Sequence, residues 1–255
     1  MLKASAFSLV TAISYGIGTN AFFSSEISQR ALGFGLAAGF FEGLYFVTLA
    51  KALSRGNLGT TYAIMRAGAM LIVWILSLTI LKEGMSAQTC VGALAVLIGV
   101  PLSQKDFRWK AFMQSIGGIF PWTSAFCIAG YHIMYSLALE DSAIMPPVLY
   151  SLSIGVAVVL LTGFVLLHRG ARQKLFNSSG RIWTLAFLTG LGMSLSFILF
   201  LESLKTIGPG LGISLRNTSI LFALVLGLWM GERLTRSQIA GVIILFFGSA
   251  LLSLN

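Results

Sequence analysis

The chain has 255 residues, a net charge of +9, 56% hydrophobic residues and 10% charged residues, and its mean hydropathy is +0.89. Soluble globular domains are about half apolar and about a quarter charged, so this composition excludes a soluble protein. It predicts an all-α polytopic membrane protein, because an open sheet exposed to lipid would leave backbone groups without hydrogen bonds.

Nine apolar runs have the length expected of membrane-spanning helices, at about 20 residues per span. We place them at residues 4–23, 31–50, 60–81, 87–103, 115–138, 143–167, 182–203, 210–230 and 237–254. The first run continues through residues 15–20 without a convincing small-residue cleavage site, so we interpret it as a span rather than a cleaved signal peptide.

The loops between these runs differ in basic residues from one side of the membrane to the other. With the N-terminus inside, the cytoplasmic loops hold Lys3, Lys51, Arg55, Lys105, Arg108, Lys110, Arg169, Arg172, Lys174, Arg181, Arg233 and Arg236. The opposite loops hold only Arg30, Lys82 and Lys205. This bias predicts a multi-pass protein of the plasma or bacterial inner membrane with a cytoplasmic N-terminus and an outside C-terminus. It also explains the net positive charge without a nucleic-acid partner.

The chain contains two related halves. The corresponding segments are 46–53 with 197–204, 63–67 with 213–217, and 82–86 with 231–235, and the glycines 92 and 99 correspond to 241 and 248. We predict a first repeat of four helices at residues 1–110 and a second of five helices at residues 111–255. The third span runs outward and the eighth inward, so the repeats are inverted, which is an architecture of alternating-access transporters.

Several motifs together resemble the EamA-type drug/metabolite transporter superfamily. They are Tyr15-Gly16 with Asn20 shortly after, Ala52-Leu53 and Ser203-Leu204 before the arginine-bearing spans, the turn Gly-Glu-Arg-Leu-Thr at 231–235, and the glycine-bearing last span of each half. The resemblance implies a carrier of ten helices in two inverted five-helix repeats, with a central cavity and cytoplasmic termini. In this chain the helix that is usually second is absent, and that loss would invert everything downstream, in agreement with the charge count.

Glu42 and Arg66 lie at similar predicted depths, roughly 12 and 9 Å from the inner ends of their spans at about 1.5 Å per residue. An ion pair between them would satisfy two charges that are expensive inside a bilayer. The pair would be structural, or it would be a switch for proton or substrate coupling. Both interpretations stay open at this stage.

Arg216 is a second intramembrane arginine, and its half of the chain supplies no acid equivalent to Glu42. With Asn217 beside it and His132 at a similar depth, it would suit a carboxylate or phosphate, which arginine binds with two parallel hydrogen bonds. The alternatives are that the side chain of Arg216 reaches the outer interface or forms hydrogen bonds with helix ends around residues 208–212. An isolated histidine such as His132 is more often an interior residue with satisfied hydrogen bonds than a proton relay.

Other polar and aromatic residues fall at the levels expected for the cavity. Tyr15, Asn20, Trp122 and Tyr131 are candidate substrate contacts, and Tyr135 shares their level. Aromatic rings there would stack on a planar or cationic group, although packing or anchoring at the interface is the commoner use of each.

The sequence therefore predicts a secondary transporter for a small organic metabolite, preferably anionic or zwitterionic, such as an amino acid or organic acid. An intramembrane enzyme would need paired acids, a Ser/His or Cys/His pair or a metal cluster at helical spacing within the bilayer, and the spans offer only the isolated His132 and Glu42, in different halves. Cys90 and Cys127 lie inside spans, so neither a metal nor another cofactor is expected. The alternative is a scaffold or accessory subunit, and the bilayer is the expected partner, with a homodimer or a partner subunit left open.

Overall fold

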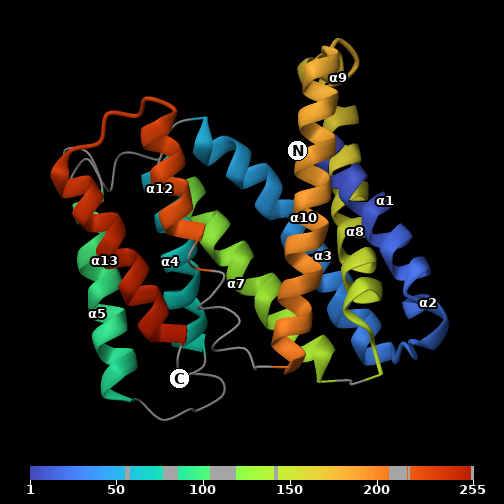
Figure 1. Ribbon diagram of the computed structural model, residues 1–255, viewed down its shortest axis with the longest axis horizontal. Coiled ribbons are helices and arrows are strands. Elements are labelled where there is room, and N and C mark those ends of the chain that lie inside the picture. Colours follow the sequence, from blue (N-terminus) through green and yellow to red (C-terminus); the bar gives the residue numbers. More distant parts are fainter. Residues whose placement is uncertain are drawn as a thin grey trace. The chain divides into compact units, whose positions relative to one another are not determined.

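The computed structural model describes residues 1–54, 58–76, 86–103, 119–140, 143–206, 217 and 219–253. All regular secondary structure in these ranges is helical (Figure 1). The helices are α1 (Leu2–Gly18), α2 (Ala21–Ser24), α3 (Gln29–Leu53), α4 (Leu58–Leu76), α5 (Ala87–Leu102), α7 (Ile119–Leu139), α8 (Pro146–Leu167), α9 (Arg169–Phe176), α10 (Gly180–Thr206), α12 (Ser219–Trp229) and α13 (Arg236–Ser253). The predicted all-α class is confirmed.

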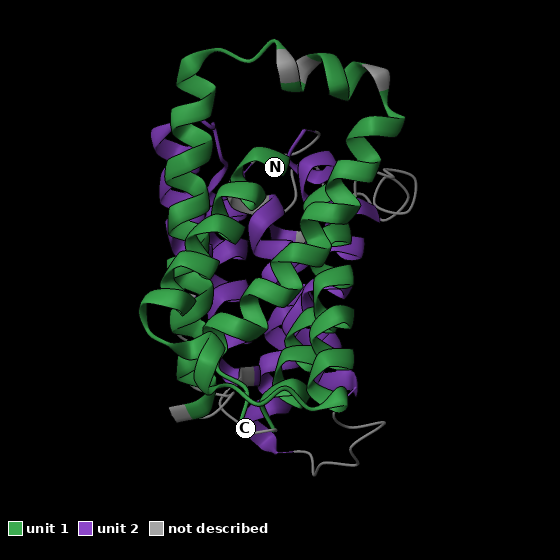
Figure 2. Ribbon diagram, turned by 90° about the vertical axis from the view of Figure 1, so that its right-hand side faces the viewer, with its two compact units in different colours: residues 1–47, 130–206 green, residues 48–129, 207–255 purple. Residues whose placement is uncertain are grey.

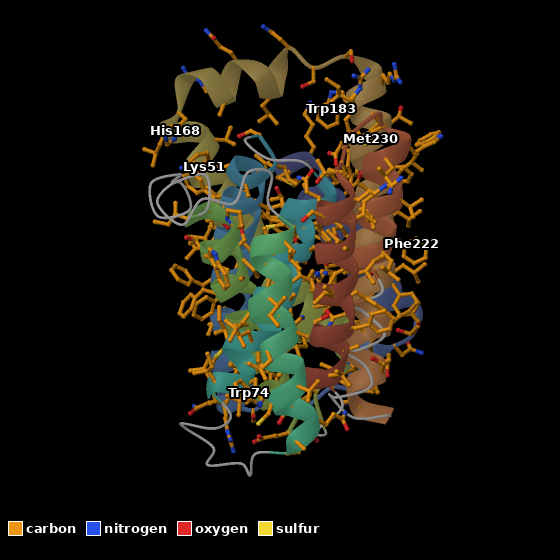
Figure 3. All side chains as sticks on the ribbon, turned by 90° about the vertical axis from the view of Figure 1, so that its left-hand side faces the viewer. Lys51, Trp74, His168, Trp183, Phe222 and Met230 are labelled. Atoms are coloured by element: carbon orange, nitrogen blue, oxygen red, sulfur yellow. The ribbon has the colours of Figure 1, made fainter. Side chains whose placement is uncertain are left out.

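Three helices, α3, α8 and α10, are long and apolar enough to cross a membrane, and α4, α5, α12 and α13 carry shorter apolar stretches. Large apolar side chains remain exposed: Phe222 by 72% and Trp229 by 85%. Phe222 and Met230 point outward in Figure 3. Such a surface suits lipid rather than water. The count of nine spans stays a prediction.

The first helix ends earlier than the sequence analysis placed it. α1 stops at Gly18 rather than at residue 23, because Asn20 adopts a left-handed conformation with φ of 57°. The N–H groups of Thr19 and Asn20 donate to the carbonyls of Tyr15 and Ile17 and so close the last turn. Asparagine tolerates this conformation better than most residues. The short helix α9 is a second difference, since no helix was predicted between 167 and 182.

The chain divides into two compact units, coloured separately in Figure 2. The first unit holds residues 1–47 and 130–206, and the second holds residues 48–129 and 207–255. The division falls inside α3 and α7, so each of these helices contributes to both units. It is a division by spatial contact and does not test the repeat boundary at residue 110, which stays a prediction.

In the first unit, α1 packs against both α10 and α8. The contact with α10 is close because Gly190 lies against the backbone of Ala4 and Ser8 and against Phe7. Fully buried aromatic and aliphatic side chains such as Tyr150 fill the centre of this unit. Dispersion contacts and close packing, rather than the exclusion of water, hold helices together in lipid.

In the second unit, α5 and α13 form a close pair through glycines on both helices. A side chain at Gly92 would meet the backbone of Gly248 and Leu252, and one at Gly241 would meet the backbone of Ser103. Residues with higher numbers on α5 contact residues with lower numbers on α13, so the two helices are antiparallel. The absence of side chains at these glycines is what permits the approach.

The charged turn at residues 231–235 closes α12 and caps α4. Gly231, with φ of 88°, follows the helix, and the N–H groups of Gly231 and Glu232 donate to the carbonyls of Leu228 and Gly227. This is the pair of bonds that ends a helix at a glycine. The Glu232 carboxylate accepts the backbone N–H of Leu58, the first residue of α4. A negative charge there complements the positive end of the helix dipole.

We expect Gly248→Ala to destabilise the protein. The added methyl group would lie 2.9 Å from the Cβ atom of Ala95 and 3.0 Å from the Gly92 oxygen, so α5 would have to move. Overpacking of this kind costs about 1–3 kcal/mol. The control is Gly192→Ala on α10, where nothing lies within 4 Å. Thermal unfolding of the two variants in detergent measures the difference, and equal melting temperatures would contradict the close contact.

We expect Glu232→Ala to lower the free energy of unfolding by about 1–2 kcal/mol, because α4 loses its capping acceptor and the charge at its N-terminus. Glu232→Gln, which keeps an acceptor oxygen, should lose less. Arg233→Ala is the matched control, since Arg233 is exposed in the same turn. A melting temperature lowered as much by Arg233→Ala as by Glu232→Ala would show that the turn, and not the cap, matters.

Candidate functional site

Glycines on α3 bring this helix close to α8 within the first unit. A side chain at Gly39 would meet the Ser153 carbonyl oxygen and Val156, and one at Gly43 would meet Ala157 and Leu160. The small-xxx-small pattern of Gly39 and Gly43 is therefore a helix-packing contact, the commonest use of such a pattern. Because the two helices are close, Glu42 on α3 and Ser153 on α8 can both contact the same residue.

That shared neighbour is Tyr135 on α7. Its hydroxyl donates to Glu42 Oε2 at 2.9 Å and lies 2.5 Å from Ser153 Oγ. Ser153 Oγ in turn donates to the Tyr150 carbonyl at 3.0 Å. Glu42, Tyr135 and Ser153 are all fully buried. A buried carboxylate needs such donors, because its desolvation is not otherwise compensated.

Counting hydrogens shows how the contacts of Glu42, Tyr135 and Ser153 depend on the protonation state of Glu42. Each hydroxyl has one hydrogen to donate. When Glu42 is ionised, Tyr135 donates to it. When Glu42 is protonated, Glu42 can donate to Tyr135, Tyr135 to Ser153, and Ser153 to the Tyr150 carbonyl. The protonated state thus supplies a hydrogen for each of the three contacts, whereas in the ionised state Ser153 has one hydrogen for two acceptors, the Tyr135 hydroxyl and the Tyr150 carbonyl.

A second polar contact ties α1 and α10 to α8. Ser8 Oγ lies 2.8 Å from the Tyr150 hydroxyl and 2.8 Å from Ser194 Oγ, and Ser194 Oγ donates to the Ser8 carbonyl at 2.6 Å. Tyr150 thus belongs to both contacts, through its carbonyl on one side and its hydroxyl on the other. Five helices of the first unit are joined by buried hydroxyl groups and one carboxylate.

Aromatic rings surround these polar groups. The Tyr150 ring stacks on Phe197 with 4.9 Å between centroids and 13° between planes. Tyr131 lies edge-on to Tyr135 at 5.9 Å and to His132 at 4.7 Å. Such ring pairs add about 0.5–1.5 kcal/mol beyond their buried area. Tyr131 and His132 are thus part of the buried interior of the first unit.

Arg66 belongs to the second unit and is only 5% exposed. Its Nε and Nη2 atoms donate to the Tyr62 hydroxyl at 3.3 and 3.2 Å, one helical turn earlier on α4. Trp122 on α7 lies against Gly68, two residues after Arg66. Asn217 is fully buried in the same unit. A buried guanidinium with aromatic neighbours is a suitable group for binding an anion.

The predicted site residues are divided between the two units. Glu42, Tyr131 and His132 lie in the first unit, and Arg66, Trp122 and Asn217 in the second. Tyr15 is 48% exposed at the end of α1, where the exposed Asn20 terminates the helix. Arg216 lies outside the described residues.

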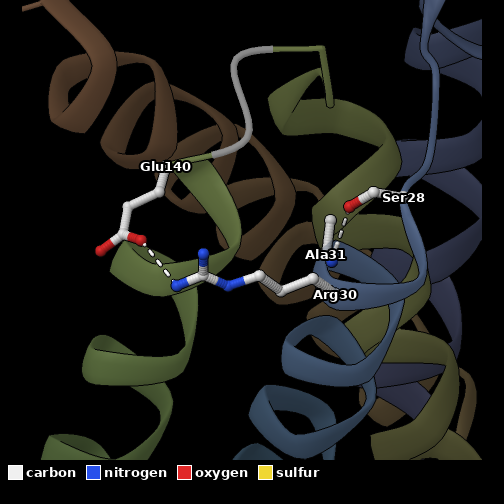
Figure 4. A network of polar contacts seen from close by, with 4 residues as sticks. All are labelled: Ser28, Arg30, Ala31 and Glu140. Carbon is white, nitrogen blue, oxygen red and sulfur yellow. Dashed lines mark hydrogen bonds and ion pairs between the residues drawn. The ribbon is translucent and has the colours of Figure 1, made fainter.

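The predicted Glu42–Arg66 ion pair stays a prediction, because its two residues belong to different units. A different ion pair lies on the surface of the first unit, between Arg30 Nη2 and Glu140 Oε2 at 2.9 Å (Figure 4). Its side chains are 65% and 56% exposed, so it contributes little to stability. Ser28 nearby caps α3 by accepting the N–H of Ala31.

Sequence reasoning missed most of the hydroxyl network. Ser8, Tyr150, Ser153 and Ser194 were not named as candidates, and Tyr135 was named only among the aromatics. The available signal was the placement of small hydroxyl residues inside apolar runs near glycines. Within the described part of the chain, no group of three or more His, Cys, Asp or Glu side chains is arranged to hold a metal ion.

Comparison with known proteins gives two findings. The model of the EamA-like transporter family matches residues 115–254. One solved crystal structure, described simply as that of a protein, has a TM-score of 0.65 and 15% sequence identity, over 98% of this chain and 84% of that chain. At that identity the likeness shows the fold alone. No protein with a curated description matches the sequence significantly.

The family match accounts for the composition as well as for the motifs. It covers more than half of the chain and almost the whole of the second predicted repeat. Members of this family are membrane transporters, and the apolar helices of the structure fit an integral membrane protein. The chain therefore belongs to the EamA-like transporter family, of the drug/metabolite transporter type.

Proposed function

We propose that the protein is a secondary transporter that moves a small anionic or zwitterionic metabolite, such as an amino acid or organic acid, by alternating access. The family match supports transport. The observation that carries the mechanism is the pairing of α5 with α13, because it relates the two halves of the chain to each other in space.

Contacts between α5 and α13 occur in equivalent pairs. A shift of 149 residues takes Gly92 to Gly241 and Ser103 to Leu252, so the contact of Gly92 with Leu252 has its counterpart in that of Gly241 with Ser103. The contact of Gly99 with Leu245 has its counterpart in that of Gly248 with Val96. Exchanging the two helices therefore turns each contact into its counterpart, which is the property of a pair of helices related by a two-fold axis.

Because α5 and α13 are antiparallel, the two-fold axis that exchanges them is perpendicular to both helices. In a membrane crossed by these helices, such an axis lies in the membrane plane. That is the symmetry of inverted repeats, in which the substrate site lies near the midplane and the repeats rock in turn. The local symmetry supports the proposal that residues 1–110 and 111–255 are inverted repeats.

The preference for an anionic or zwitterionic solute rests on the charges placed inside the spans. Arg66 is buried on α4, and Arg216 holds the equivalent place in the second repeat. Arginine binds carboxylate and phosphate groups bidentately. The intramembrane acid Glu42 is hydrogen-bonded to Tyr135 within the first unit, which favours a structural use of this carboxylate over the recognition of a cationic solute.

We expect Arg216→Ala to abolish solute binding while the fold is kept. The measurement is thermal stabilisation of the purified protein across a panel of amino acids, organic acids, phosphates and quaternary amines. A ligand at a hundred times its dissociation constant should add about 2.7 kcal/mol to the free energy of unfolding. Arg30→Ala is the control, since the Arg30–Glu140 pair is exposed. An anion that still stabilises Arg216→Ala would remove Arg216 from the site.

A panel in which no compound stabilises the wild type would contradict the carrier proposal. Co-purification of a larger membrane partner would then favour the accessory subunit.

We expect Tyr135→Phe to reduce stability through Glu42. Hydrogen bonds to a charged group contribute about 1.5–3 kcal/mol, against about 0.5–1.5 kcal/mol for neutral pairs. Tyr135→Phe should therefore cost more in the wild type than in a Glu42→Gln background, and a double-mutant cycle on unfolding free energies measures the coupling. The half-exposed Tyr15 supplies a control, Tyr15→Phe.

Under this structural role, Glu42→Gln keeps solute affinity and transport. Lost transport with unchanged melting would instead make Glu42 a coupling switch.

A further inference from the structure

The first unit contains a cavity of about 450 Å³ beside the start of α1. Its walls are Phe7 and Val10 from α1, Val158 from α8, Leu175 from α9 and Trp183 from α10, and the lining is almost entirely apolar. Val10 is 61% exposed and Trp183 46% exposed, so the cavity opens at the side of the unit. Its volume is in the range of small-ligand sites, about 300–1,000 Å³.

Lys3 supplies the one charged group in the wall of this cavity. Its Nζ atom is buried and lies 3.7 Å from the centroid of the Trp183 ring, and no acceptor among the described residues forms a hydrogen bond with it. The cation–π contact compensates part of the desolvation of the ammonium. A buried ammonium without an acceptor is costly, so an anionic group beside Lys3 would stabilise the site.

The surrounding segments are basic. α9, which connects α8 to α10 at this end of the unit (Figure 1), carries Arg169, Arg172 and Lys174, and Arg181 follows at the start of α10. Residues 1–10 and 158–183, which form the cavity and its edge, contain no Asp or Glu. The electrostatic potential at this end therefore attracts anions.

The helix α9 has the character of an interfacial segment. Leu175 faces the cavity and shares one side of the helix with Ala171, whereas the exposed Gln173 lies on the opposite side. Short amphipathic helices of this kind lie along a membrane surface, with the apolar side toward the acyl chains and the basic side toward the headgroups. The cavity would then open at the level where headgroups meet acyl chains.

We propose that this cavity binds an anionic phospholipid, with its phosphate against Lys3 Nζ and an acyl chain along the apolar wall. A free inorganic anion shares the phosphate chemistry but cannot use the apolar lining, which favours a lipid. The lateral opening and the adjoining interfacial helix favour entry from the bilayer. The inference does not depend on the solute that is carried.

The test is binding of phosphatidylglycerol and phosphatidylcholine with identical acyl chains to the detergent-purified protein, measured by native mass spectrometry. We expect the wild type to bind phosphatidylglycerol about tenfold more tightly, a factor that corresponds to about 1.4 kcal/mol. Lys3→Gln should remove this preference. Lys51→Gln is the matched control, because Lys51 also lies over an aromatic ring, that of Phe120 at 5.4 Å, and it should leave the preference unchanged.

A second variant tests the apolar wall. Ala6→Phe fills the cavity and should weaken both lipids, whereas Val225→Phe on the exposed face of α12 should weaken neither. An unchanged preference in Lys3→Gln, or full binding in Ala6→Phe, would overturn the proposal. Inorganic phosphate that displaces phosphatidylglycerol at millimolar concentration would also overturn it and make the site one for free anions.

Discussion

Close approach of helices at glycine is the constraint on which the described structure depends. Helices in lipid gain little from leaving water, so they associate where backbones can touch and where small polar groups can bond across the contact. Gly39 and Gly43 do this between α3 and α8, Gly190 does it between α10 and α1, and Gly92 and Gly248 do it between α5 and α13. A methyl group at most of these positions would force backbones apart.

This close approach determines where polar side chains can be buried. Serine is short, so Ser153 reaches Tyr135 only because α3, α7 and α8 are near one another, and Ser194 reaches the Ser8 carbonyl only because Gly190 is one turn away. A buried carboxylate is tolerated at Glu42 for the same reason. The polar network and the glycine contacts are therefore one feature: removing a glycine would also break hydrogen bonds.

Composition and apolar runs predicted the all-α fold, and the close contact of α3 with α8 occurs at Gly39 and Gly43, whose small-xxx-small spacing is typical of helix packing. The early end of α1 was not predicted, because it depends on the left-handed conformation of Asn20. The helix α9 was not predicted either, because the charge count assigned its basic residues to a loop. The partners of Glu42 were unpredictable because a period of 3.6 residues gives the face of a helix but not the neighbour opposite it. Tyr135, Ser153 and Tyr150 become partners only through tertiary packing.

The basic residues show the same limit of sequence reasoning. Counting Lys and Arg treats them as equal charges that set orientation, but the structure gives them different surroundings. Arg30 pairs with Glu140 at the exposed surface, Lys205 donates to the Ile144 carbonyl, and the Nζ atom of Lys3 is buried against the Trp183 ring. Orientation needs only the sign of the charge and the side of the membrane. A lysine whose ammonium is withdrawn from water is costly for that purpose alone, since an exposed lysine would serve equally well, so its position points to an additional contact with an anion.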